Sequence, residues 1–252
     1  MKHLRFWTLW RRNSRVWRKH VMATLIGNLG QPLLFLLAMG YGIGHEMQTI
    51  DGLTYLQFLA PGLVTSSVMY SAAFETTYGS YTRLSMQKTY EAILMTPLGI
   101  TDIALGEIFW GASKGLLSAI IMLAMLPLFG VWPSIWTLAL LPVLFMSGVF
   151  FAAFGLIMTA LASSYEFFNY FISLILTPLF LFSGIFFPLK TIVPSARIFF
   201  ELLPLTPIVT LSRMLCYGQF HEPWLLKIAG SLLLTLFTCW LSVIFLRKRL
   251  IQ

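Results

Sequence analysis

Six long apolar runs, separated by short polar segments, dominate the chain. A helix needs about 20 apolar residues to cross the hydrocarbon core of a bilayer. The runs therefore predict six membrane-spanning helices, at about residues 20–44, 57–82, 103–129, 135–162, 167–187 and 225–246. Pro32 and Pro178 fall inside the first and fifth runs, which membrane helices tolerate because neighbouring helices satisfy the freed backbone groups.

A basic and aromatic segment, residues 1–19, precedes the first run. Trp7, Trp10 and Trp17 recur at spacings of three and seven, which places them on one face of a helix with arginines around the rest. This pattern predicts an amphipathic helix lying on the cytoplasmic leaflet of the membrane. A simple topology anchor has the same pattern, and both interpretations apply.

The polar segment between the second and third runs, RLSMQKTYEAILMTPLG, spans Arg83–Gly99 and favours a helix. Between about Leu84 and Met95 its apolar residues recur at helical spacing, and polar residues occupy the opposite face. Pro97 is expected to end this helix, and Thr101 to cap the next one. Two roles fit: a connector resting on lipid headgroups, or a docking helix for a cytoplasmic motor.

The segment between the fifth and sixth runs is too apolar for a solvated loop, yet proline and glycine break it into pieces too short to span. The breaks are Pro188, Pro194, Pro204, Pro207 and Gly218. Ser195 and Thr206 are expected to cap two short helices, with Gly218 just past the second. The pattern predicts a helical hairpin that re-enters the outer leaflet, and an amphipathic loop on the membrane surface is the alternative.

Composition supports a membrane protein, because 58% of the residues are hydrophobic and only 10% are charged, whereas a soluble domain carries about 25% charged residues. Of the 17 lysines and arginines, twelve lie before the first run, after the sixth, or in the second polar segment, and three lie in the fifth. Basic residues favour the cytoplasmic side. We therefore expect a multi-pass protein of the bacterial inner membrane with both termini in the cytoplasm.

Three charges lie inside the second and third predicted spans: Glu75, Glu107 and Lys114. An unpaired charge at such depth costs on the order of 3 kcal/mol or more. We therefore predict that Lys114 pairs with Glu75 on the neighbouring helix, while Glu107 stays closer to the headgroups or to the polar helix. The pair either locks the second and third spans together or carries motion between them.

Catalytic, metal-binding and cofactor-binding patterns are not found in the sequence. The phosphate-binding pattern G-x-x-x-x-G-K-[ST] does not occur, so any nucleotide hydrolysis must come from a partner. Ser113 and Lys114 are adjacent and point about 100° apart on a helix, so they do not form a catalytic dyad. The four histidines are scattered singly, which disfavours a zinc site.

Several stretches resemble the permease subunits of type-2 ABC exporters, and most of all the nodulation-factor export permeases of the NodJ type. The most specific stretch is FETTYGSYTRLSMQKTYEAILMTPLGITDIALGE, which covers Phe74–Glu107. The block FSGIFFPL, from Phe182, is shared more widely among such permeases. The resemblance covers nearly the whole chain. It implies an all-α integral membrane protein with an interfacial helix at residues 1–19 and a six-span domain at residues 20–250.

The resemblance also implies partners. A separate cytoplasmic ABC ATPase, NodI-like, would bind ATP and Mg and dock on the polar helix between spans two and three. A second permease copy would complete a homodimer. The cargo of such permeases is a lipid-linked or acylated oligosaccharide, and relatives move other glycans, lipids or drugs. The residues assigned to the docking helix are Arg83, Met86, Gln87, Lys88, Tyr90 and Glu91.

Two other classes of membrane protein were weighed against an exporter. A stand-alone membrane transferase would need convergent acid and base groups, and the cytoplasmic loops offer only Glu91, Asp102 and Glu166 without a matching base. A secondary carrier would show a clear repeat between its halves, and none is found in the sequence.

Overall fold

The computed structural model describes residues 5–21, 30, 32–42, 44, 49–50, 52–191, 193–219 and 223–251. These residues are helical almost throughout, apart from one β-bridge between Ile50 and Leu53. The predicted all-α class is therefore confirmed for the described part of the chain. Helices with α labels run over Phe6–Trp17 (α1), Tyr55–Phe74 (α3), Thr89–Leu94 (α4), Ile100–Met125 (α5), Thr137–Leu161 (α6), Glu166–Phe171 (α7), Thr177–Phe182 (α8), Pro194–Glu201 (α9), Thr206–Tyr217 (α10) and Trp224–Ile251 (α11).

Short 3₁₀ and π segments, labelled η, extend or join these helices. They are Arg18–His20 (η1), Leu36–Gly42 (η2), Glu75–Gly79 (η4), Thr82–Met86 (η5), Leu126–Phe129 (η6), Ile172–Leu176 (η7) and Leu189–Thr191 (η8). The π segments η4 and η5 continue α3, so one helical rod runs from Tyr55 to Met86. Another rod, Glu166–Phe182, is formed by α7, η7 and α8.

Three helices of the described chain are long and apolar enough to cross a membrane: Ile100–Phe129, Thr137–Leu161 and Trp224–Ile251. They coincide with the third, fourth and sixth predicted spans. The rod that contains α3 and the Glu166–Phe182 rod occupy the positions of the second and fifth. Residues 22–29, 31 and 43 of the first predicted span lie outside the described residues, so the number of six spans stays a prediction.

The core of the bundle is α3, which packs against α5, α6 and α10. Most of α3 is buried, and its first turn is fixed by Thr54 and Gln57, which exchange hydrogen bonds between side chain and backbone. Glycines bring the backbones of these helices close together. A Cβ at Gly148 would lie 3.0 Å from Ala112 Cα, and one at Gly155 would lie 3.0 Å from Ala73 O. Small residues at such crossings favour tight packing of membrane helices.

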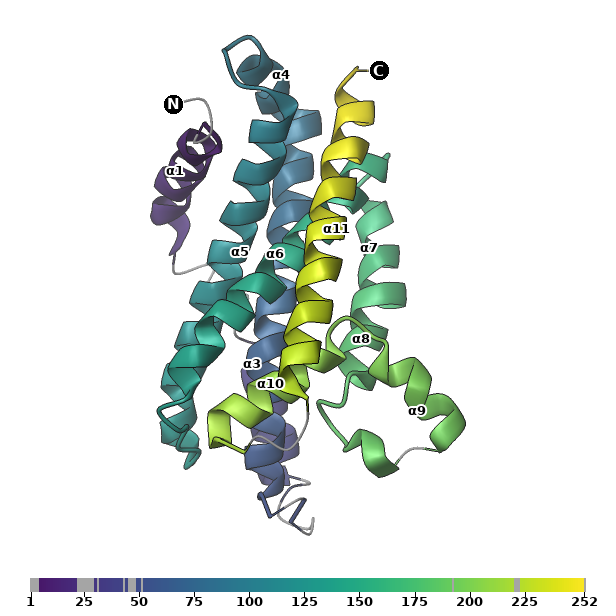
Figure 1. The fold of residues 1–252 in the computed structure, drawn as a ribbon. Coiled ribbons are helices and arrows are strands. Elements are labelled where there is room, and N and C mark those ends of the chain that lie inside the picture. The colour runs from purple at the N-terminus through teal and green to yellow at the C-terminus, as the bar shows by residue number, and fades with distance from the viewer. Residues whose placement is uncertain are drawn as a thin grey trace.

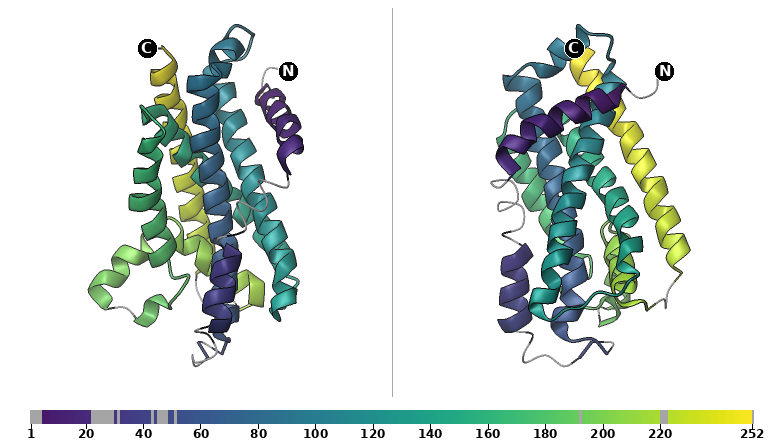
Figure 2. Two further views of the ribbon diagram at one scale, coloured as in Figure 1. Left: turned by 180° about the vertical axis from the view of Figure 1, so that it is seen from behind. Right: turned by 90° about the vertical axis from the view of Figure 1, so that its left-hand side faces the viewer.

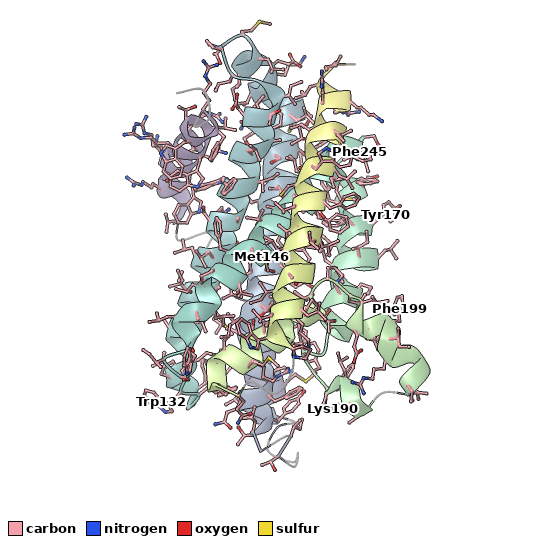
Figure 3. All side chains as sticks on the ribbon, in the orientation of Figure 1. Trp132, Met146, Tyr170, Lys190, Phe199 and Phe245 are labelled. Atoms are coloured by element: carbon pink, nitrogen blue, oxygen red, sulfur yellow. The ribbon has the colours of Figure 1, made fainter. Side chains whose placement is uncertain are left out.

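Figure 1 shows that α1, α4 and the end of α11 lie at one end of the molecule, and that α9 and α10 lie at the other. Helix α1 runs across the outside of the bundle and lies against α5 (Figure 2). Many apolar side chains point outward from the bundle, as Trp132, Tyr170 and Phe199 do in Figure 3; each of these three is more than half exposed. An apolar outer surface of this kind suits a protein surrounded by lipid.

The single helix predicted over residues 84–95 is wrong. The rod containing α3 continues to Met86, and α4 begins only at Thr89, because Lys88 adopts a left-handed conformation with φ 49°. Thr101 does not cap the next helix either. Helix α5 begins one residue earlier, and the Asp102 carboxylate accepts a hydrogen bond from Gly99 N at 2.9 Å.

The two short helices predicted before the sixth span are present as α9 and α10, and Gly218 ends α10 with φ 68°, as expected. The predicted caps are wrong: α9 begins with Pro194 rather than at Ser195, and Thr206 lies inside the first turn of α10. Pro207 follows Thr206 in that turn, and the Thr206 hydroxyl donates to Phe200 O at 2.6 Å.

Pro188 precedes η8, and Pro204 lies between α9 and α10. Helix α10 is anchored to the bundle through Arg213, whose guanidinium donates to Phe58 O and Gly184 O and lies 3.7 Å from the centre of the Phe58 ring. Helix α9 projects from the bundle and contacts α8 through stacked Phe182 and Phe200 rings. Re-entry of this hairpin into a membrane stays a prediction.

Candidate functional site

A buried group of charges joins α3, its π-helical extension and α5. Lys114 Nζ lies 2.6 Å from Glu75 Oε2, and both side chains are about nine-tenths buried. The predicted contact between Lys114 and Glu75 is therefore present. Glu75 is the first residue of η4, and π turns of this kind often occur at functional sites.

Arg83 lies between two carboxylates. Its Nη2 atom is 2.9 Å from Glu75 Oε1 and 2.6 Å from Glu107 Oε2. The structure therefore places Arg83 with the buried charges rather than on the exposed face of the polar segment. Glu107 was expected near the headgroups or the polar helix; it contacts Arg83, the first residue of the polar segment, and its side chain is fully buried. We call Glu75, Arg83, Glu107 and Lys114 the charge cluster.

Neutral donors complete the charge cluster. Trp110 Nε1 donates to Glu75 Oε1 at 2.9 Å, Ser80 Oγ donates to Glu107 Oε2 at 3.1 Å, and Asn13 Nδ2 donates to Glu107 Oε1 at 3.2 Å. The cluster holds two carboxylates and two cations, so its formal charge is zero. The balanced formal charge and the added hydrogen bonds offset the desolvation penalty that buried ions incur.

Helix α1 is seated on α5 by aromatic contacts that sequence reasoning missed. Trp10 Nε1 donates to Ser113 Oγ at 3.0 Å, and the Trp17 ring meets the Trp110 ring edge to face at 5.9 Å. Gly106 leaves room for this approach, since a Cβ there would lie 3.1 Å from Phe6 O. Gly106 and Asn13, which is an uncharged polar residue among arginines and tryptophans, were the available signals in the sequence.

The residues of the docking segment divide into exposed and buried groups. Met86 is 72% exposed, and Lys88 and Glu91 form an exposed ion pair at 3.6 Å. Gln87 is also exposed, whereas Tyr90 is fully buried. Arg5 Nη1 donates to Pro97 O at 2.7 Å, so the start of α1 is tied to the end of this segment.

A family model described as ABC-2 type transporter matches residues 5–217. The chain belongs to the ABC-2 type transporter family. The family resemblance inferred from the sequence is thus confirmed. Together with the three long apolar helices, it makes the chain a membrane permease, a transport subunit of an ABC transporter.

Curated relatives of this permease cover nearly its full length. It is 36% identical to Nodulation protein J of Sinorhizobium fredii over 246 residues, which are 97% of this chain and 93% of that protein. It is 35% identical to Nodulation protein J of Bradyrhizobium diazoefficiens, over 98% of this chain and 94% of that protein. The Escherichia coli protein named Inner membrane transport permease YadH is 27% identical over about half of each chain.

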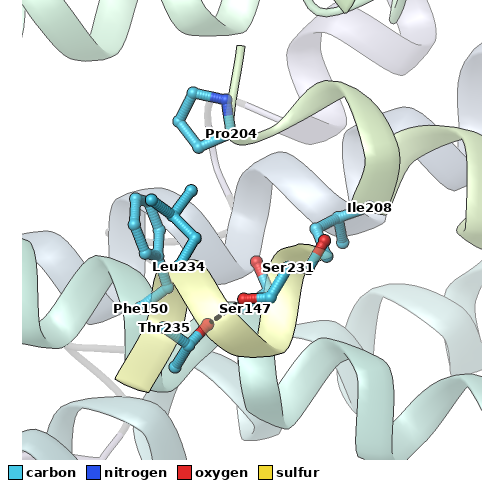
Figure 4. Close-up of a pocket in the computed structure, with 7 residues that line it drawn as sticks. All are labelled: Ser147, Phe150, Pro204, Ile208, Ser231, Leu234 and Thr235. Atoms are coloured by element: carbon cyan, nitrogen blue, oxygen red, sulfur yellow. Dashed lines mark hydrogen bonds between the residues drawn. The ribbon is translucent and has the colours of Figure 1, made fainter. Parts of the chain in front are cut away.

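A small pocket lies between α6, α10 and α11 of the permease (Figure 4). Its volume is about 10 Å³, which is no larger than one water molecule needs. Ser147 and Ser231 face it, and within the described structure neither hydroxyl has a hydrogen-bond partner. The pocket is too small for a cargo molecule.

Within the described residues, no group of His, Cys, Asp and Glu side chains has the arrangement of a metal site.

We expect Lys114→Met to destabilise the permease by on the order of 3 kcal/mol, because Glu75 and Glu107 would then share only the Arg83 cation. Adding Glu75→Gln should recover most of that loss, because Arg83 and Glu107 remain as a balanced pair. Thermal unfolding of the detergent-purified protein measures both effects.

Lys88→Met is the matched control, because it removes one member of an exposed ion pair and should change stability little. A double variant no more stable than Lys114→Met would show that Glu75 is not the group that Lys114 balances.

Proposed function

We propose that the chain is the membrane-spanning permease subunit of an ATP-driven exporter of the inner membrane. A separate cytoplasmic ABC ATPase, NodI-like, docks on the segment between α3 and α5, and a second permease copy completes a homodimer. ATP and Mg are bound by the ATPase. The observation that carries this proposal is family membership over residues 5–217, which implies an ATPase partner.

The exposed residues of the docking segment suit a protein contact. Met86 and Met95 are 72% and 89% exposed, and in the sequence they flank the exposed Lys88–Glu91 pair. Exposed methionines beside charges give an interface both apolar contact and electrostatic complementarity. Arg83 and Tyr90 are buried, so we remove them from the proposed docking surface and add the exposed Met95. The surface is then Met86, Gln87, Lys88, Glu91 and Met95.

The charge cluster offers a route for the motion of the ATPase into the bundle. Arg83 precedes the exposed docking residues by three positions and bridges Glu75 of η4 to Glu107 of α5. A displacement of the docking segment changes the position of Arg83 directly. Because both carboxylates depend on the same guanidinium nitrogen, the displacement reaches both helices at once.

For the cargo, we propose a lipid-linked or acylated oligosaccharide of the nodulation-factor kind. The support is the name of the relatives, Nodulation protein J, and their 35–36% identity over nearly the whole chain. Another glycan, a lipid or a drug is the alternative cargo within the same family. A stand-alone membrane transferase is the alternative of another class.

Reversing the exposed pair, Lys88→Glu with Glu91→Lys, together with Gln87→Ala should strongly reduce copurification of the ATPase. These side chains lie on the proposed surface and contribute little to the fold. The matched control is Arg197→Glu with Glu201→Arg, an exposed pair on α9 at the opposite end of the molecule. Full copurification with the first variant would rule out docking at this surface.

Orientation is tested by labelling single cysteines at positions 88 and 190, both exposed, after Cys216→Ala and Cys239→Ala. The basic residues of α1, the docking segment and the end of α11 support a cytoplasmic location for the end of the molecule where these elements lie. An impermeant maleimide added to intact cells should therefore label position 190 and leave position 88 unlabelled. Labelling at position 88 from outside would reverse the proposed orientation.

The cargo is tested with the permease and its ATPase reconstituted together in lipid nanodiscs. An acylated chito-oligosaccharide should stimulate ATP hydrolysis several-fold, and the same oligosaccharide without its acyl chain should not. Equal responses to both, or no response, would exclude this cargo. Copurification of the permease with the ATPase is measured separately, so the formation of this complex is tested independently of the cargo.

A further inference from the structure

A polar cleft lies where α1 meets α5 and the rod containing α3. Its volume is about 280 Å³, close to the lower limit for small-molecule sites. The proposed export function uses Glu75 and Arg83 for coupling and Gln87 for docking, but it places no ligand in the cleft. The residues that line it are Arg12, Asn13, Val16, Trp17, Glu75, Gly79, Thr82, Arg83, Gln87, Trp110 and Lys114.

Hydrogen-bond donors dominate the cleft. Arg12, Arg83 and Lys114 supply three cations, and Trp17 and Trp110 supply indole N–H groups. Two of these donors are buried without an acceptor within the described structure: Arg83 Nε and Trp17 Nε1. An unpaired buried donor costs free energy, so the cleft favours a ligand that brings acceptor oxygens.

Glu75 is the one carboxylate among the lining residues, and its oxygens are already occupied. Arg83 and Trp110 donate to Oε1, and Lys114 donates to Oε2. The charge cluster is neutral as a whole, with Glu107 balancing the second cation. Arg12 therefore gives the cleft a net positive charge, and its own contact within the cleft is a 3.2 Å hydrogen bond to Asn13 Oδ1.

We propose that this cleft binds a phosphate group, which fits both the positive charge and the unpaired donors. A phospholipid headgroup and free phosphate are the two sources of that group. The setting favours the headgroup, because α1 is an amphipathic helix whose Trp7 and Trp10 rings stack at 4.2 Å and whose Trp7 is half exposed. Tryptophan and arginine on such a helix are typical of the headgroup region.

The bound phosphate would bridge α1 to the two elements that carry the charge cluster, the rod containing α3 and α5. Arg12 and Trp17 lie on or at the end of α1, Arg83 follows α3, and Lys114 belongs to α5. A ligand held by all three elements stabilises the seat of α1 on the bundle. It does so whatever the cargo is and whether or not the ATPase docks as proposed.

The test is isothermal titration calorimetry, in which dihexanoyl-phosphatidylglycerol is titrated into the purified permease in neutral detergent. We expect saturable binding that Arg12→Gln weakens about tenfold, because a charged hydrogen-bond partner is lost. Trp17→Phe keeps an aromatic ring and removes the unpaired N–H, and should weaken binding several-fold. The matched controls are Arg15→Gln and Trp7→Phe, which are exposed on α1 and do not line the cleft; both should bind as the parent does.

Inorganic phosphate distinguishes the two sources. If it competes with the lipid and loses affinity in Arg12→Gln, the site recognises free phosphate; if the lipid binds and phosphate does not compete, the source is a headgroup. Either result supports a phosphate site. Failure of both to bind would overturn it, and so would equal weakening by Arg12→Gln and Arg15→Gln, which would indicate attraction to the general charge of α1.

Discussion

Charges buried in an apolar helix bundle must balance, and this constraint organises one end of the molecule. Two carboxylates and two cations meet where α3 gives way to π turns, and a single guanidinium nitrogen serves both carboxylates. At low dielectric, loss of any one member leaves an uncompensated charge, which costs several kcal/mol. The helices that carry these groups are therefore held in fixed register with one another, and α1 is included because Asn13 donates to Glu107.

Close backbone packing fixes the rest of the bundle. Glycines on α5 and α6 leave no room for side chains against α3, and Thr159 of α6 donates across the gap to Thr76 O at 2.6 Å. This contact lies one residue from Glu75, so tight packing and the charge cluster meet at the start of η4. Motion at this point has to shift helices as units, because tightly packed helices do not deform continuously.

The pairing of Lys114 with Glu75 could be predicted because it follows from helical position and from the cost of an unpaired charge. The position of Arg83 could not. The π turns η4 and η5 add residues to the helical repeat and rotate everything after them, and a periodicity of 3.6 residues does not register such a change. The break at Lys88 was missed for a related reason, since a left-handed lysine carries no sequence signal. The contact of α1 with α5 escaped prediction because tryptophans suit a lipid surface and a protein surface equally well.

The long separation in sequence between the hydrogen-bonded residues of α1 and α5 has a consequence for synthesis. Trp10 finds its hydrogen-bond partner, Ser113, 103 residues later in the chain, and Asn13 finds Glu107 94 residues later. Helix α1 therefore leaves the ribosome long before the surface that receives it exists. Helix α3 is also synthesised before the helices that pack against it. Three of its hydroxyl groups already have acceptors within α3, because Thr65, Ser66 and Ser67 donate to carbonyls three or four residues earlier. These hydroxyl groups of α3 therefore need no other helix to satisfy their hydrogen bonds. Asn13 of α1, by contrast, gains its carboxylate partner only after α5 has been synthesised.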